Sequence, residues 1–201
     1  MTLLSLILLV SLYNAWVVQI SSYKHWEPAL IANQRYEPVF DWLNNNAAKD
    51  QVAMADEVMS YLIPAYTFLN TVSAEDGHYT LAAGEEQMLE RTFLRIRLDG
   101  LKGENAQDYF FENRDFISAA VYGRLYKNPP ANYGSIPDEK LVFIAEKYQE
   151  FLLIPLKEAL EKYQADYLIW DTAKHPEWQI KQYQFFKEIH QVNEFRIYKI
   201  L

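Results

Sequence analysis

The chain has 201 residues, of which 27 are acidic and 19 basic, and its formal net charge is −8 at pH 7. This balance argues against nucleic acid as a partner, because phosphate binding needs concentrated Lys and Arg, and it disfavours broad contact with anionic lipid head groups. Cysteine is absent, which excludes disulfides, thiolate metal sites and cysteine nucleophiles together.

The segment from Thr2 to Tyr23 contains no charged residue and is mostly apolar. A helix of about 20 residues crosses a hydrocarbon core of roughly 30 Å, so residues 1–23 are predicted to form a transmembrane helix, with Tyr13 and Trp16 suited to a membrane interface. A cleaved signal peptide and a buried core helix are the alternatives. A signal peptide fits less well, because the segment lacks a basic n-region and a small-residue cleavage site.

Residues 24–201 are predicted to form one soluble α/β domain, long enough to bury its own core. A helix is expected over Ala29 to Trp42 with a restart at Pro38, and a short buried strand over Gln51 to Ala55. The next two apolar runs, Tyr61–Thr67 and His78–Leu81, fit either a strand or a helix start, and a turn at 73–77 separates them.

Three consecutive helices follow, so residues 85–163 are predicted to be a largely helical insertion. The first runs from Glu85 to Leu98 and ends before Gly100, a residue typical of helix C-termini. The second covers Ala106 to Tyr126 and stops at a proline-rich loop, 129–134. The third opens at a capping box in 135–138 and, with a restart at Pro155, runs to about Tyr163.

The C-terminal part is predicted to complete the sheet. Ala165 to Asp171 is typical of a buried strand, and Pro176 to Phe185 is expected to be a short helix. Phe186–Val192 and Phe195–Ile200 then form a predicted hairpin with its turn at 193–194. This order of elements indicates an α/β fold with a small sheet, a helical insertion and a C-terminal β-hairpin.

Two C-terminal runs, Tyr163–Asp171 and Phe195–Ile200, carry the pattern of a strand with Tyr-x-x-Asp-Tyr and a closing strand with Tyr-Lys. With the stretch 35–43 that leads to the strand at 52–55, they resemble the C-terminal extracytoplasmic domain, including the last transmembrane helix, of bacterial GT-C type multi-pass membrane glycosyltransferase-like proteins. That family transfers sugar from a polyprenyl-phosphate carrier and depends on an acidic residue in its first extracytoplasmic loop, to which no position here corresponds.

The resemblance implies a non-catalytic accessory or recognition domain. It would be a single-pass protein of the cell membrane with its soluble domain outside the cytoplasm. Its partners would be other membrane subunits, a glycan or a lipid-linked sugar. A further hypothesis is that the chain is the C-terminal piece of a longer reading frame.

Three carboxylates are candidate catalytic residues, because Asp56 and Glu57 close the first predicted strand and Asp171 closes a later one. In a parallel sheet they would gather at the carboxyl edge, where an acid and a base or a hard-cation site form. This supports the alternative of a small membrane-tethered hydrolase or transferase. The same residues also suit a structural role as solvated strand ends or helix caps.

Other residue types point to binding rather than catalysis. Trp26, Tyr66 and Tyr133 are candidate ligand platforms, because tyrosine and tryptophan faces suit sugars and membrane interfaces, although they suit a core equally. The four histidines are scattered, with no pair at i+3 or i+4, so the H-E-x-x-H zinc motif is absent. The sequence therefore predicts no metal and no cofactor.

Overall fold

The structure is a computed structural model that describes residues 3–73, 84–122 and 136–201. It divides the chain into two compact units, Met1–Asp41 and Trp42–Leu201. The predicted strand or helix start at 78–81, the loop at 129–134 and the end of the helix expected to reach Tyr126 lie outside the described residues.

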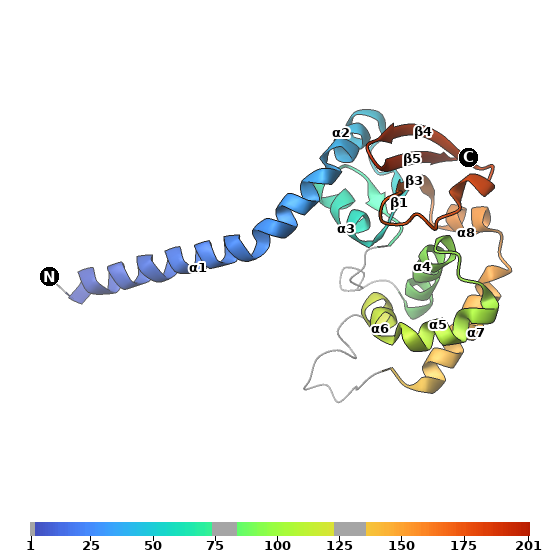
Figure 1. The fold of residues 1–201 in the computed structure, drawn as a ribbon, viewed down its shortest axis with the longest axis horizontal. Helices are drawn as coiled ribbons and strands as arrows, with labels where there is room; N and C mark the ends of the chain where they lie inside the picture. The colour runs from blue at the N-terminus through green and yellow to red at the C-terminus, as the bar shows by residue number, and fades with distance from the viewer. Residues whose placement is uncertain (1–2, 74–83, 123–135) are drawn as a thin grey trace. The chain divides into compact units, whose positions relative to one another are not determined.

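The first unit consists mainly of α1 (Leu3–Asn33), which Figure 1 shows as one long helix. The 3-10 turn η1 (Gln34–Tyr36) links it to α2 (Glu37–Asn46), which extends past the boundary between the units. The helix expected over 29–42 is therefore wrong in its bounds, since α1 continues to Asn33. Pro38 lies in the first turn of α2, where its missing N–H breaks no helical hydrogen bond.

Within the part of the chain that the structure describes, no helix combines the length and the apolar character needed to cross a bilayer.

The second unit is built on a five-stranded sheet with the order β2-β1-β3-β5-β4. β1 (Val52–Met54), β3 (Ala165–Asp171), β4 (Phe186–Val192) and β5 (Phe195–Ile200) confirm the predicted strands and the C-terminal hairpin. β1 pairs in parallel with β3 and with β2 (Asn70–Thr71), whereas β5 is antiparallel to both β3 and β4. β2 was not predicted, because two residues are too few to show an alternating pattern.

The ambiguous run at 61–67 is helical. It belongs to α3 (Glu57–Tyr66), which follows β1 and precedes β2. Asp56 is the N-cap of this helix, and its side chain accepts a hydrogen bond from the backbone N–H of Met59. The local capping signal therefore outweighs Pro64, which lies inside the helix near its C-terminal end.

The helices predicted between residues 85 and 163 are confirmed in the described part of that range, with one correction. α4 (Glu85–Leu98), α7 (Asp138–Leu152) and α8 (Leu156–Lys162) match the expected helices closely. The helix expected from Ala106 is instead broken into α5 (Ala106–Glu112) and α6 (Arg114–Tyr122), preceded by the 3-10 turn η3 (Gly103–Asn105). At the break, the backbone N–H and the side-chain amide of Asn113 both donate to the Tyr109 carbonyl. An asparagine that binds backbone in this way favours a helix end over a helix interior.

The helix predicted over Pro176–Phe185 is wrong, because that segment contains only the 3-10 turn η4 (Ile180–Gln182). Its apolar anchors Trp178 and Ile180 are both buried but lie two positions apart, a spacing that would put them on opposite faces of a helix. An irregular loop lets both enter the core, and their burial outweighs the local helical tendency.

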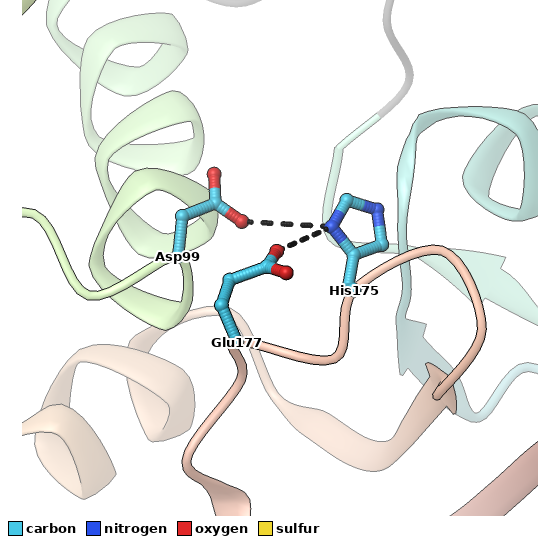
Figure 2. A group of neighbouring side chains, drawn as sticks. All are labelled: Asp99, His175 and Glu177. Atoms are coloured by element: carbon cyan, nitrogen blue, oxygen red, sulfur yellow. Dashed lines mark hydrogen bonds and ion pairs between the residues drawn. The ribbon is translucent and has the colours of Figure 1, made fainter.

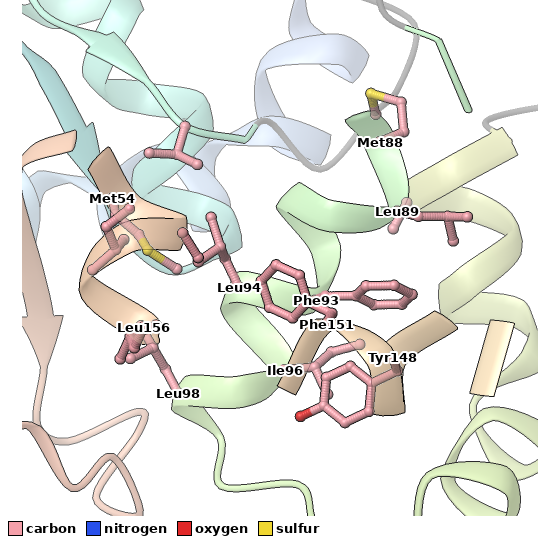
Figure 3. Packing of buried hydrophobic residues seen from close by; sticks show 14 of the residues in the cluster. Met54, Met88, Leu89, Phe93, Leu94, Ile96, Leu98, Tyr148, Phe151 and Leu156 are labelled. Carbon is pink, nitrogen blue, oxygen red and sulfur yellow. The ribbon is translucent and has the colours of Figure 1, made fainter. Parts of the chain in front are cut away.

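One hydrophobic core joins the helices to the sheet. The cluster includes Phe93 and Leu94 from α4, Tyr148 from α7, and Leu168 and Tyr198 from the sheet. Figure 3 shows Phe93, Phe151 and Tyr148 meeting at its centre; the ring centroids of Phe93 and Tyr148 are 5.2 Å apart, in an edge-on contact. Figure 1 shows α4, α5, α6 and α7 grouped together. The core also contains Leu98 from the end of α4 and Trp178 from the loop after β3, so it packs these two segments together.

Candidate functional site

The sheet has a switch in strand order at β1. From β1 the chain passes through α3 to β2 on one side, and it later returns as β3 on the other side of β1. Both neighbours run parallel to β1, so the carboxyl ends of β1 and β3 open at the same edge. In open α/β sheets, ligands bind in the crevice at such a switch point.

Asp56 and Asp171 both lie at this edge, as the sequence indicated, and each is 2% exposed. Asp56 Oδ1 accepts from the backbone N–H of Met59 at 2.9 Å. Asp171 Oδ1 accepts from the backbone N–H groups of Ala173 and Lys174, each at 3.1 Å. Both carboxylates therefore cap backbone groups, which favours their structural interpretation.

Glu57 is held in ion pairs. It contacts the Arg95 guanidinium, and its Oε2 lies 3.1 Å from the Lys174 ammonium. The same ammonium is 3.5 Å from Asp56 Oδ1, so Lys174 ties the loop after β3 to the start of α3. The structure thus brings Asp56, Glu57 and the segment following Asp171 to one edge, with the positive charges of Arg95 and Lys174 between them.

A second cluster at this edge was not predicted: Asp99, His175 and Glu177, shown in Figure 2. Asp99 caps the C-terminus of α4, and the other two side chains come from the loop after β3. His175 Nδ1 lies 2.9 Å from Glu177 Oε1 and 3.8 Å from Asp99 Oδ1. One ligand atom from each residue lies within 4.8 Å of the others, so the three side chains converge on one point.

His175 is held from several directions. Its backbone N–H donates to the Asp171 carbonyl at 2.9 Å, and its own carbonyl accepts from the Trp170 indole at 2.6 Å. Its ring stacks on Trp178, with centroids 4.8 Å apart and an interplanar angle of 24°. Nε2 is buried without a hydrogen-bond partner among the described residues, so the polar contacts of the ring lie at Nδ1.

Asp99 is fixed by the same loop, because the Trp178 indole N–H donates to its Oδ1 at 2.7 Å. Burial raises the pKa of Asp99 above its ordinary value, and the Trp178 hydrogen bond and the charge of Arg95 oppose that rise. The carboxylate is therefore partly desolvated and also hydrogen-bonded, an environment that favours a cation beside it.

The candidate aromatic platforms are not brought to this edge as a group. Tyr66 is exposed at the C-terminal end of α3, and its backbone carbonyl accepts a hydrogen bond from the Asn44 side chain at 2.9 Å. The side chain of Trp26 and the whole of Tyr133 lie outside the described residues.

A separate open groove of about 610 Å³ is lined by residues of α4 and α7, with an apolar floor that includes Phe93 and Phe151. Its two lysines are paired within the groove: Lys140 lies 2.5 Å from Glu85 Oε1, and Lys147 lies 2.6 Å from Glu150 Oε2. The groove has the size of a small-molecule site. Its best-positioned polar group is Glu90, whose Oε2 already accepts from Lys162 and Tyr163 at 2.6 Å each.

Sequence reasoning missed the cluster for identifiable reasons. Asp99 directly precedes Gly100, so the sequence indicates only a helix end there. His175 has no second histidine at i+3 or i+4, so it does not match a helical zinc motif. The local signal was the i, i+2 spacing of His175 and Glu177 directly after a strand. Asp99 joins them only through the fold.

Comparisons with protein family models, with curated protein sequences and with solved structures find no match to this chain. The fold and the site define a mixed α/β protein with a cluster of one histidine and two carboxylates beside the switch point of its sheet.

Proposed function

We propose that this protein is a membrane-anchored, non-catalytic accessory or recognition domain, similar to the tail of a GT-C type glycosyltransferase. The observation that carries the proposal is the apolar surface of α1. Its consecutive residues Ile7, Leu8, Leu9 and Val10 are all more than half exposed. Because successive helical residues point about 100° apart, these four side chains surround the helix on every side.

A helix that is apolar all round belongs in a core or a bilayer, not in water. Trp16 and Val18 extend the same surface, with 61% and 62% exposure, and no charge occurs between Thr2 and Tyr23. Covering one such side chain is worth about 1.5–3 kcal/mol, so lipid contact along this stretch would hold the protein at a membrane. The single-pass span of residues 1–23 is also part of this proposal, although no helix of the described residues meets the length and apolar character of a span.

The non-catalytic character is supported by the candidate carboxylates. Asp56 and Asp171 accept backbone hydrogen bonds as caps, and Glu57 is paired with Arg95 and Lys174. A general acid or base needs a free face toward a substrate. Side chains already engaged in this way support a structural role over the alternative of a hydrolase or transferase.

Membrane fractionation of the full chain tests the anchor. The wild type is expected in the carbonate-washed membrane pellet, whereas a Leu9→Lys/Leu12→Lys variant is expected to be released. A lysine near the centre of a membrane helix costs about 2.5–3.5 kcal/mol. Ile31→Lys is the matched control, because Ile31 is 58% exposed in the same helix but lies outside the uncharged stretch. A wild-type chain in the supernatant would contradict the proposal.

The absence of cysteine gives a direct test of the extracytoplasmic placement. A Gln107→Cys variant carries a single thiol at an exposed position of α5. A membrane-impermeant maleimide is expected to label it in intact cells, because the resemblance places the second unit outside the cytoplasm. Labelling only after the cells are lysed would place the unit in the cytoplasm.

The accessory role is tested by activity and capture. Purified full-length protein is expected to show no turnover of a polyprenyl-phosphate-linked sugar, and either to bind that lipid or to cross-link to another membrane subunit. Turnover abolished by Asp56→Asn or Asp171→Asn would instead favour the enzyme.

A further inference from the structure

The geometry of Asp99, His175 and Glu177 is close to that of a metal site. In a tetrahedral site with bonds of about 2.0–2.2 Å, neighbouring ligand atoms stand about 3.3–3.6 Å apart. His175 Nδ1 lies 2.9 Å from Glu177 Oε1 and 3.8 Å from Asp99 Oδ1, distances on either side of that range. All three ligand atoms lie within 4.8 Å of one another, so side-chain rotations would be needed to bring them to this spacing around one ion.

The donor set selects the kind of ion. One imidazole nitrogen with two carboxylate oxygens suits first-row divalent transition ions such as Zn²⁺, whereas Ca²⁺ and Mg²⁺ favour oxygen alone. Zinc binds through unprotonated nitrogen, so the ion would take the place of the proton between His175 Nδ1 and Glu177 Oε1.

The surroundings orient two of the ligands, although His175 Nε2 has no hydrogen-bond acceptor among the described residues. The Trp178 indole binds the Asp99 carboxylate at 2.7 Å and stacks on the His175 ring, so one buried side chain orients two ligands. Hydrogen-bonded carboxylates of this kind are common around bound metals. The His175 backbone is hydrogen-bonded to Asp171 and Trp170 of β3, which fixes the position of the histidine relative to the sheet.

The local charge also favours a cation. Asp99 and Glu177 face the imidazole. Lys174 is paired with Glu57 and Asp56, and Arg95, which also pairs with Glu57, still acts electrostatically on Asp99. Glu177 is the most exposed of the three side chains, at 45%, against 24% for Asp99 and 11% for His175.

We propose that Asp99, His175 and Glu177 form a binding site for one divalent transition-metal ion of the Zn²⁺ class, with its remaining coordination positions open to water or a ligand. The site lies at the carboxyl end of β3, beside the switch point in strand order at β1. The proposal is independent of the membrane anchor, since every residue it uses belongs to the second unit.

Metal titration of the full-length protein in detergent, without a histidine tag, tests the site. Calorimetry with Zn²⁺ and absorption spectroscopy with Co²⁺ are expected to show one ion per chain, with the visible bands of nitrogen and oxygen ligation. Asp99→Asn and His175→Gln are each expected to weaken binding by more than about 100-fold. Trp178→Phe, which removes the hydrogen bond to Asp99 and replaces the buried indole on His175 by a smaller ring, is expected to weaken it by about 10-fold to 100-fold.

Two matched controls separate this site from general metal adsorption. His190→Gln removes a histidine that stacks on Trp42, and Glu112→Gln removes an exposed carboxylate. Neither is expected to change the affinity or the Co²⁺ spectrum. Because a His175 or Asp99 variant could unfold, Glu177→Gln provides a variant at an exposed ligand, also expected to weaken binding and alter the spectrum. A wild type that binds neither ion below millimolar concentration, or a Glu177→Gln variant that binds as tightly as wild type, would overturn the proposal.

Discussion

Trp178 is the residue that holds the cluster at the switch point together, because its indole binds Asp99 and its ring covers His175. In Trp178→Phe a smaller ring replaces the buried indole and the hydrogen bond is lost, which leaves a cavity and a partly buried carboxylate short of a donor. The free energy of unfolding is expected to fall by about 1–3 kcal/mol. Urea titration followed by far-ultraviolet circular dichroism measures this loss.

A double-mutant cycle provides the control for that experiment. The cost of Trp178→Phe is expected to be smaller in an Asp99→Ala background, because the hydrogen bond is then absent both before and after the Trp178 substitution. An equal cost in the two backgrounds would assign the whole effect to packing of the indole ring.

Asp99 also gives the stability of the second unit a pH dependence. Burial raises its pKa in the folded state, so the folded protein binds more protons than the unfolded chain near that pKa. Its contribution to stability is therefore fully present below the unfolded pKa, and it is lost as the pH rises through the folded pKa. Asp99→Asn is expected to remove this component. Urea midpoints of both proteins across the acidic range test it, and identical pH profiles would contradict it.

At the level of the elements, α4 ends at a glycine that the backbone requires. Gly100 has φ +84°, the left-handed region, and a methyl group added there would meet no atom within 4 Å. Gly100→Ala is thus expected to cost about 1–2 kcal/mol from backbone strain alone. Gly103→Ala is the matched control, because Gly103 has no left-handed φ and an added methyl group would meet its nearest atoms, on Gln149 and Leu152, at an ordinary 3.4 Å. Thermal unfolding of both variants compares them, and equal losses would refute the explanation.

The N-terminus of α3 depends on Asp56 in a comparable way. Asp56→Ala removes the acceptor for the Met59 N–H and is expected to destabilise the protein by about 0.5–2 kcal/mol. Asp56→Asn is expected to cost much less, because asparagine caps a helix as well as aspartate does. If the two variants were equally destabilised, the ion pair with Lys174 would matter more than the cap. Urea denaturation distinguishes these outcomes.

The sequence predicted those elements whose residues carry their own signal. The apolar spacing of α4, the unbroken run of β3 and the hairpin turn at Asn193, with φ 52°, are local features. The break at Asn113 depends on a hydrogen bond from its side chain to a backbone carbonyl, and the spacing of apolar residues does not reveal such a bond. The loop at Trp178 was mistaken for a helix because only the tertiary core explains why two alternate residues are buried.

The candidate site depends even more on contacts between residues that are distant in the sequence. The three predicted carboxylates do reach one sheet edge, since the ends of parallel strands follow from the strand order. The contact between Trp178 and Asp99 spans 79 positions along the chain, and no local pattern encodes it. Grouping Asp99 with His175 therefore required the packing of α4 against the loop after β3.

At the scale of the whole molecule, the helical insertion and the sheet share one core, and this has a consequence for unfolding. The buried cluster runs without interruption from Phe93 and Leu94 of α4 to Leu168 and Tyr198 of the sheet. A domain with a continuous core unfolds as one cooperative unit. A change inside the insertion should therefore destabilise the sheet by the same amount.

Leu94→Ala tests this coupling, because Leu94 is 0% exposed and its truncation is expected to cost about 2–5 kcal/mol. Hydrogen exchange is the measurement. The slowest amides of α7, β3 and β5 should lose the same free energy of protection, because all of them exchange through global unfolding. Leu153→Ala is the matched control: Leu153 is 85% exposed, so its truncation is expected to change stability by less than about 0.5 kcal/mol. Protection lost in α4 and α7 but retained in β3 and β5 would show that the insertion unfolds independently, and the shared core would then not couple the helices to the sheet.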